Sequence, residues 1–239
     1  MTTNVFDRLA RQAATDSRWS ATIPGYAIVY LDDGPFDKIL LTQPITTLFA
    51  GCIQRIDAWK TWLRDPNRLM ANIPVADAGI AICMIDMRSS SVVFEHNQEI
   101  TLPDARFAGT GAWPAHGCWG KNKDARRSVE SAKLADRLSG GSVKYVDFAS
   151  GATNLPDSED YASIKQNFST KGMVMYFQNP GHVALPEAVA NDPVIAQAAD
   201  QIAKGEIKLT APSPAAMNEW TAEDVARLHN VLAEYFPAS

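Results

Sequence analysis

Short apolar and β-branched runs dominate the first half of the chain and are typical of β-strands. The first run covers residues 2–6 and ends with Val5 and Phe6. The polar residues Asp7 and Arg8 separate it from the next run, so these two runs are predicted to pair as a hairpin. Turn residues such as Gly34 punctuate the later runs. Strands are predicted at residues 2–6, 11–15, 26–30, 38–41, 45–50, 79–87, 92–95, 105–108, 143–147, 173–177 and 182–185.

Helical spacing of apolar residues begins after Gly51, where Ile53, Ile56 and Trp59 fall on one side of a predicted helix. The last predicted helix starts at Thr221, which is a favourable N-cap residue. Residues 67–77 have room for one more short helix, and residues 149–171 are polar and predicted to be a loop. Helices are predicted at residues 52–64, 112–120, 124–138, 193–204 and from 221 onward.

The order of these elements is strands, helix, strands, two helices, strands and a helical tail. That order is typical of an α+β protein in which antiparallel strands form layers and helices pack outside them. The chain has 239 residues, enough for one large domain or two small ones.

Composition narrows the function classes. Hydrophobic residues make up 46% and charged residues 21%, which is ordinary for a soluble globular protein. The net charge of −5 gives no support for nucleic-acid binding, and no apolar run is long enough to cross a membrane. The first thirty residues lack the apolar segment of a signal peptide, and the three scattered cysteines have no metal or redox spacing. We therefore expect a cytoplasmic protein without metal, cofactor, nucleic-acid or membrane partners.

Thr2 is the first candidate for chemistry. Initiator methionine is normally removed before a residue as small as threonine, so the mature chain is expected to begin at Thr2. A threonine at a free N-terminus carries a hydroxyl and an α-amine on adjacent carbons, and the amine pKa is about 7.7–8.0. The amine can therefore act as the base for its own hydroxyl. Many proteins begin Met-Thr, so a catalytic role for Thr2 needs support from residues downstream.

Five motifs supply that support when they are taken together and in order. They are Thr2-Thr3, Thr15-Asp16-Ser17-Arg18, Lys38-Ile39, Phe49-Ala50-Gly51, and the spread-out pair Gly109-Thr110-Gly111-Ala112 and Asp136-Arg137-Leu138-Ser139-Gly140-Gly141. Each motif alone is weak, since a Gly-Gly pair after a helix is an ordinary C-terminal stop. Over residues 2–148 the chain resembles proteasome β-subunits and the related bacterial two-component protease, which are N-terminal-nucleophile peptidases.

The resemblance implies a fold and an activity. The fold is a four-layer αββα sandwich, with a core at residues 1–148 and a C-terminal extension at 149–239 that adds the last strands and helices. The activity is threonine-type endopeptidase cleavage of unfolded polypeptides or peptides inside a homo-oligomeric ring, with an ATPase unfoldase as a partner. Residues 65–78 are too short for the family's long second helix, and this departure weakens the case for the unfoldase.

The resemblance also implies a role for each candidate site residue. Thr2 would be the nucleophile, Lys38 the cation beside its hydroxyl, and Asp16 the counter-ion of that lysine. The backbone N–H of Gly51, at the start of a helix, would donate to the oxyanion. The residues that would hold the α-amine through hydrogen bonds are Thr110, Asp136 and Ser139.

Two other functions fit the same residues. An N-terminal-nucleophile amidase would cleave small amides without peptide turnover. A catalytically inactive protein of the same fold would serve as a scaffold or virion-associated ring. Retention of Met1 would favour the inactive protein, because it blocks the amine that serves as base.

Overall fold

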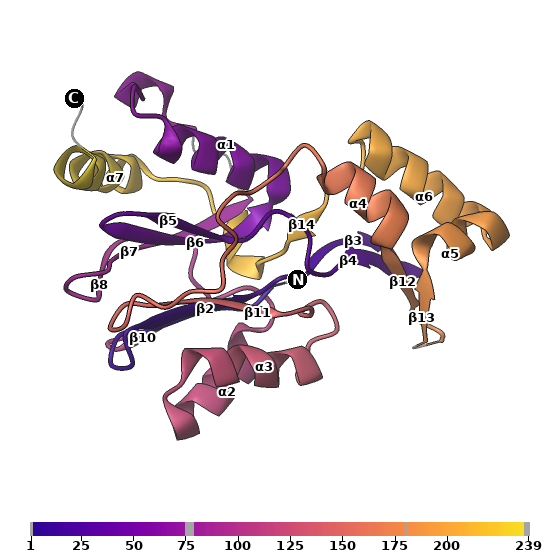
Figure 1. Ribbon diagram of the computed structural model, residues 1–239, viewed down its shortest axis with the longest axis horizontal. Coiled ribbons are helices and arrows are strands. Elements are labelled where there is room, and N and C mark those ends of the chain that lie inside the picture. Colours follow the sequence, from indigo (N-terminus) through magenta and orange to yellow (C-terminus); the bar gives the residue numbers. More distant parts are fainter. Residues whose placement is uncertain (1, 75–78, 180, 237–239) are drawn as a thin grey trace.

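A computed structural model describes residues 2–74, 79–179 and 181–236 of the protein. Two antiparallel sheets form its centre (Figure 1). The smaller sheet has the strand order β11-β2-β1-β10-β9. The predicted hairpin is present as β1–β2, which pairs Asn4 with Thr15 and Asp7 with Gln12, so Asp7 lies in the strand and not in the turn where it was predicted. The strands are β1 (Asn4–Asp7), β2 (Gln12–Asp16), β9 (Ile100–Leu102), β10 (Ala105–Ala108) and β11 (Val143–Asp147).

The larger sheet has the order β13-β12-β4-β3-β14-β6-β7-β8, and β5 pairs with β6 beside this path. The tail of the chain supplies β14, which lies between strands from the first quarter of the sequence. The strands are β3 (Trp19–Ile23), β4 (Ala27–Leu31), β5 (Ile39–Thr42), β6 (Ile45–Cys52), β7 (Ile80–Asp86), β8 (Ser91–His96), β12 (Met173–Tyr176), β13 (His182–Ala184) and β14 (Thr210–Ala211).

Alternation along β1 directs side chains to both faces of the smaller sheet. Val5 points to the face that is covered by α2 (Ala112–Asn122) and α3 (Ala125–Ala135), where it packs in one cluster with Trp119. Phe6 points the other way and packs against Leu48 of the larger sheet. The smaller sheet therefore has helices on one face and the larger sheet on the other.

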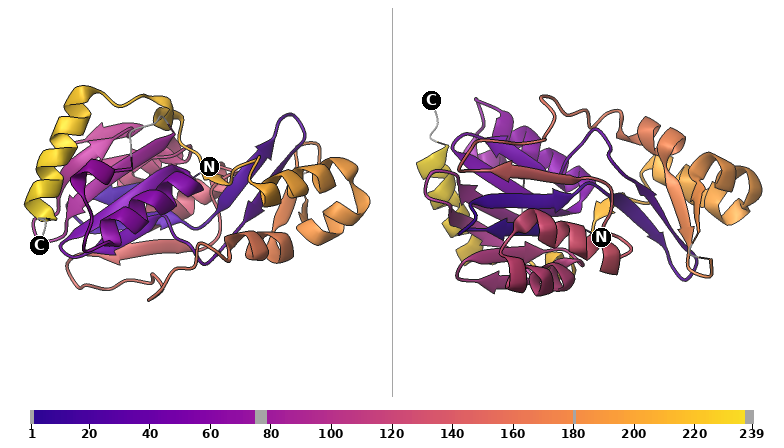
Figure 2. Two further views of the ribbon diagram at one scale, coloured as in Figure 1. Left: turned by 90° about the horizontal axis from the view of Figure 1, so that it is seen from above. Right: turned by 60° about the horizontal axis from the view of Figure 1, so that its bottom comes forward.

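The other face of the larger sheet is covered by α1 (Ile53–Arg64) and α7 (Ala222–Tyr235) (Figure 1). Phe49 of β6, Ile56 of α1 and Leu232 of α7 belong to the main hydrophobic core there. Helices α4 (Ile164–Lys171), α5 (Leu185–Asn191) and α6 (Pro193–Lys204) project with β12 and β13 to one side of the molecule (Figure 2). Two 3₁₀ turns, η1 (Met70–Asn72) and η2 (Pro214–Met217), complete the described elements.

Several elements differ from the sequence-based prediction. The predicted loop at 149–171 contains α4, which buries only Ile164 and Phe168 and so leaves a weak periodic signal. Helix α3 ends at Ala135, three residues before the predicted end, and its C-cap is Asp136. Only a 3₁₀ turn lies within 67–74, and residues 75–78 of the predicted short helix lie outside the described residues. The sequence did not predict β3, β9, β14 or α5.

None of the helices in the described ranges combines the length and apolar character that crossing a membrane requires.

Candidate active site

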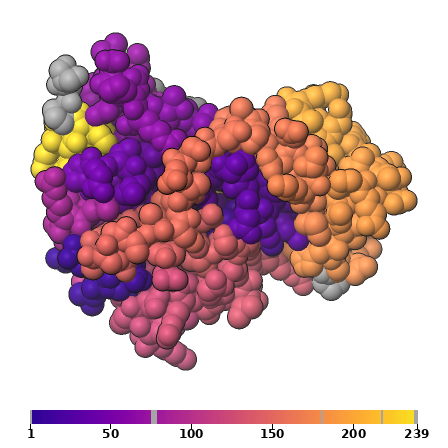
Figure 3. All heavy atoms as spheres, in the orientation of Figure 1, coloured from indigo at the N-terminus to yellow at the C-terminus, as the bar shows by residue number. Residues whose placement is uncertain are grey.

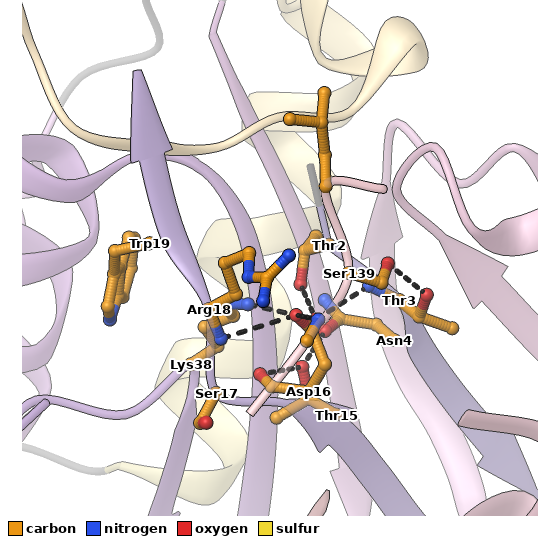
Figure 4. Close-up of polar contacts among 12 residues, drawn as sticks. Thr2, Thr3, Asn4, Thr15, Asp16, Ser17, Arg18, Trp19, Lys38 and Ser139 are labelled. Carbon is orange, nitrogen blue, oxygen red and sulfur yellow. Dashed lines mark hydrogen bonds and ion pairs between the residues drawn. The ribbon is translucent and has the colours of Figure 1, made fainter. Parts of the chain in front are cut away.

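The carboxylate of Asp16 lies at the centre of a buried polar cluster at the end of β2 (Figure 4). Its Oδ1 atom accepts a hydrogen bond from the Thr2 hydroxyl at 2.7 Å and one from the Lys38 Nζ atom at 2.9 Å. The backbone N–H of Thr3 donates to the same oxygen at 2.9 Å. A hydroxyl and an ammonium group are therefore held together by one carboxylate oxygen.

The second oxygen of Asp16 accepts backbone hydrogen bonds. The N–H of Gly140 donates to Oδ2 at 3.0 Å and the N–H of Arg18 at 3.3 Å. Burial alone would raise the pKa of the Asp16 carboxyl, but the Lys38 charge and the hydrogen bonds from Thr2, Lys38 and Thr3 outweigh it, and the pKa lies below its usual value. Asp16 is therefore an ionised acceptor for every donor around it.

Lys38 is completely buried, and its Nζ atom lies 5.6 Å from the centroid of the Trp19 ring. Burial lowers the pKa of the Lys38 ammonium, and the nearby Asp16 charge opposes this shift only in part. Lys38 thus gives up its proton more readily than a surface lysine does. In its protonated form Lys38 places a positive charge beside the Thr2 hydroxyl, because both groups donate to the same oxygen of Asp16.

The β1–β2 hairpin brings these groups together. Pairing of Asn4 with Thr15 sets the register, and the next residues on each strand, Thr3 and Asp16, follow it with a backbone hydrogen bond of 3.3 Å from Asp16 N to Thr3 O. The Thr15 hydroxyl also donates to the Asn4 side-chain oxygen at 2.6 Å. The hairpin register therefore fixes Thr2 and Thr3 beside the carboxylate.

The glycines at 109 and 111 allow a loop to approach the start of β1. Gly109 has a φ of +95°, and a Cβ atom there would lie 1.9 Å from the Thr2 carbonyl oxygen. A Cβ atom on Gly111 would lie 1.9 Å from the Thr3 hydroxyl oxygen. The Gly111 N–H donates to the Thr2 carbonyl at 3.2 Å, so both glycines serve a close backbone approach.

Asp136, Thr110 and Ser139 form a second branch of the cluster. The hydroxyls of Thr110 and Ser139 donate to Asp136 Oδ2 at 2.9 and 2.8 Å. The Ser139 hydroxyl also lies 2.7 Å from the Thr3 hydroxyl oxygen. The structure therefore brings all three residues together next to Thr3, and their predicted contact with the α-amine of Thr2 stays a prediction.

Gly51 does not open a helix, contrary to the sequence-based prediction. It lies inside β6, opposite Ile80 of β7 on one side and Ala211 of β14 on the other, and α1 begins only at Ile53. Its φ of +127° and the close approach of the Gly79 carbonyl, 2.1 Å from a built Cβ atom, require glycine. Its role as an oxyanion donor stays a prediction.

Arg18 is a further member of the cluster, and no role for it was predicted from the sequence. Its guanidinium makes two hydrogen bonds of 2.7 Å to Asp32 and one of 2.8 Å to the Arg137 carbonyl, and it stacks over Tyr30. A Cβ atom on Gly140 would lie 2.3 Å from this guanidinium. Arg18 therefore fixes the loop whose Gly140 N–H reaches Asp16.

Metal-binding clusters are absent from the described ranges, where no group of three or more His, Cys, Asp or Glu side chains is arranged to hold an ion.

Comparison with known proteins gives structural neighbours only. No protein-family model and no curated protein sequence matches the chain. Proteasome-like structures are similar to it, among them BPH of Thiobacillus denitrificans in complex with epoxomicin, at 13% identity over 61% of this chain and 96% of that one, with a TM-score of 0.41. Eukaryotic HslV from Trypanosoma brucei is similar at 13% identity over 60% and 97% of the two chains, with a TM-score of 0.38. Both TM-scores are low, so the function is inferred from the geometry of this chain.

Proposed function

We propose that this protein is a threonine-type peptidase of the N-terminal-nucleophile class, with Thr2 as its nucleophile. The observation that carries the proposal is the shared oxygen of Asp16, which binds the Thr2 hydroxyl at 2.7 Å and the Lys38 ammonium at 2.9 Å in a buried site. A structural ion pair alone has no need of a hydroxyl from the second residue of the chain.

In the proposed reaction the Oγ1 atom of Thr2 attacks the peptide carbonyl carbon. Its proton passes to the α-amine, directly or through one water, and then to the leaving amine as the C–N bond breaks. The resulting acyl-enzyme is hydrolysed by water. The Lys38 charge favours the developing alkoxide and disfavours protonation of the α-amine, and Asp16 balances that charge.

The remaining candidate residues have supporting roles in the proposal. The Gly51 N–H would donate to the oxyanion, and that role requires the N–H to be free of the β6 ladder. The hydroxyls of Thr110 and Ser139, both bonded to Asp136, would orient the α-amine.

We extend the proposal to architecture and assembly. The succession of α2 and α3, the smaller sheet, the larger sheet, and α1 with α7 supports a four-layer αββα sandwich. In this architecture residues 1–148 are the core and 149–239 an extension. We propose a cytoplasmic homo-oligomeric ring that cleaves unfolded polypeptides or peptides. An ATPase unfoldase is a further proposed partner of this ring. A solution mass near the 26.0 kDa of one chain, measured by light scattering, would refute the ring.

A peptide epoxyketone tests the nucleophile directly, because it reacts with both the hydroxyl and the amine of an N-terminal threonine. Intact mass and peptide mapping should find Met1 removed and one adduct on Thr2. Thr2→Ala keeps a residue small enough for methionine removal but lacks the hydroxyl, so it should stay unlabelled.

Three outcomes would contradict the proposal. A fully trimmed protein that resists the probe is not a threonine peptidase. Retained Met1 without reaction favours an inactive scaffold. Turnover of small amides without any peptide cleavage favours the amidase.

A further inference from the structure

Lys60 is a completely buried lysine on α1, and two of its hydrogen bonds reach the residues on either side of Lys38. Its Nζ atom donates to the carbonyl of Asp37 at 2.6 Å and to the carbonyl of Ile39 at 2.9 Å. A third hydrogen bond of 2.6 Å runs to Glu159 Oε1. An ammonium group has three N–H donors, so Lys60 uses all of them. Two of its acceptors are the carbonyls of the residues directly before and after Lys38, the proposed catalytic lysine.

These two carbonyls lie at the start of β5, one in the strand at Ile39 and the other just before it at Asp37. Within the described residues β5 pairs only with β6, and the Phe49 N–H of β6 donates to the Lys38 carbonyl at 2.9 Å. The carbonyls of Asp37 and Ile39 alternate with that of Lys38 and point to the other side, where Lys60 meets them. Lys60 thus takes the place of the missing neighbouring strand for the segment that carries Lys38.

Glu159 completes this arrangement from a distant part of the chain. It lies on the connection between β11 and α4, which runs across the front of the molecule in Figure 3 and beside α1 in Figure 1. Its Oε1 atom binds Lys60 and also accepts the Asp37 N–H at 2.9 Å, while Oε2 pairs with Arg64. Glu159 therefore holds the 37–39 segment in two ways, directly through the Asp37 N–H and indirectly through Lys60.

The buried pair is a costly way to fill this position on α1. Burial lowers the pKa of Lys60 to about 8, although Glu159 opposes the shift. Replacing buried ion pairs by apolar residues of similar size is often neutral or stabilising. Ile56 and Leu63 show that the same face of α1 otherwise carries apolar residues. Stability alone thus gives little reason for a lysine at position 60.

We propose that Lys60 and Glu159 are positioning residues that hold the 37–39 segment so that the Lys38 ammonium meets Asp16 and Thr2. This inference rests on the proposed function for its catalytic consequence. Neither residue touches the reacting atoms. A displacement of 1 Å at a catalytic group can cost about 10²-fold in rate.

The experiment compares Lys60→Met and Glu159→Gln with the control Leu63→Ala. Lys60→Met keeps the length of the side chain but removes all three donors, and Glu159→Gln keeps an acceptor while removing the charge. Leu63 is 2% exposed on the same helix and belongs to the apolar core, so its truncation destabilises α1 but leaves the three hydrogen bonds of Lys60 in place. We expect epoxyketone labelling of Thr2 to slow about 10²-fold in Lys60→Met. Glu159→Gln should slow less, and Leu63→Ala should keep the wild-type rate below its own unfolding temperature.

A second readout does not depend on activity. Lysine ¹³Cε signals can be titrated by NMR in the intact protein, with the Lys38 signal assigned by its loss in Lys38→Met. Once the hydrogen bonds from Lys60 and Glu159 to residues 37–39 are lost and the segment hydrates, the pKa of Lys38 should rise towards its ordinary value in Lys60→Met and less so in Glu159→Gln. Wild-type titration of Lys38 in both folded variants overturns the inference, as does equal slowing by Leu63→Ala. If the wild-type protein is not labelled, the proposed function fails while the titration still decides the positioning role.

Discussion

Replacing Asp16 by asparagine leaves the Lys38 ammonium buried without its counter-ion. Lys38 is completely buried, and its ion pair with Asp16 is formed at 2.9 Å. Removing one partner of a buried pair costs about 3–5 kcal/mol, because the other charge stays desolvated. Since a domain has about 5–15 kcal/mol of total stability, Asp16→Asn should remove about a fifth of it or more.

The reverse change should be milder. In Lys38→Met the Asp16 carboxylate keeps the Thr2 hydroxyl and the three backbone N–H groups of Thr3, Arg18 and Gly140. The loss is then close to that of one hydrogen bond to a charged group, about 1.5–3 kcal/mol. The double variant buries no unpaired charge, so it should be more stable than the sum of the two losses predicts, with a coupling energy of about 1.5–3 kcal/mol.

Urea unfolding followed by tryptophan fluorescence measures this cycle, and Trp19 beside Lys38 provides a local reporter. The pH dependence gives a second check. The pKa of Asp16 is lower in the folded protein than its usual value, so its contribution is present above about pH 3.9 and is lost as the pH falls through the folded-state pKa. Asp16→Asn should lack this acid loss. Strictly additive losses, or a less stable Lys38→Met than Asp16→Asn, would refute the reasoning.

Three further changes test other parts of the structure. Gly109→Ala places a Cβ atom 1.9 Å from the Thr2 carbonyl oxygen at a φ of +95°. The free energy of unfolding, measured by thermal unfolding, should therefore fall by more than the about 1–3 kcal/mol that backbone strain alone costs. Wild-type stability would contradict the close approach. Ser139→Ala removes a donor from the buried Asp136 carboxylate and should cost about 1–3 kcal/mol in urea unfolding, whereas an unchanged midpoint would show that solvent replaces it. Burial lowers the pKa of His96, so the unfolded chain binds a proton first and stability should fall as the pH drops below about 6.5. His96→Gln should flatten that slope, and an NMR titration of His96 at its ordinary pKa would exclude the effect.

Local patterns in the sequence were sufficient for the hairpin and several helices. Val5 and Phe6 alternate between two cores, so the strand and its two buried faces follow from two adjacent residues. Thr221 caps α7 with a capping box to Asp224, a signal that is complete within four residues. The Thr15-Asp16-Ser17-Arg18 motif could be singled out because it directly follows the predicted hairpin, and the role of Asp16 stays a prediction.

Other elements left no local signal. The two residues of β14 are too few to show a period, and they form a strand only because β3 and β6 flank them. Gly51 looked like the start of a helix because Ile53 follows it, but the pairing partners across the sheet keep it in β6. Lys60 is an exception, because it follows Ile56 by one turn on the otherwise apolar face of α1, but no prediction was made from that position.

The sequence by itself determined which groups this protein has available: a hydroxyl at residue 2, a carboxylate after the first hairpin and a lysine before an edge strand. Tertiary structure alone decided that they share one oxygen, and that Gly140, 124 residues from Asp16, and Glu159, 99 residues from Lys60, hold that arrangement in place. The physical reason is that charges and backbone donors far apart in sequence gain strong partners only when burial removes water from around them. A hydrophobic period records which face of an element is buried, and it carries no information on which distant polar group will lie opposite.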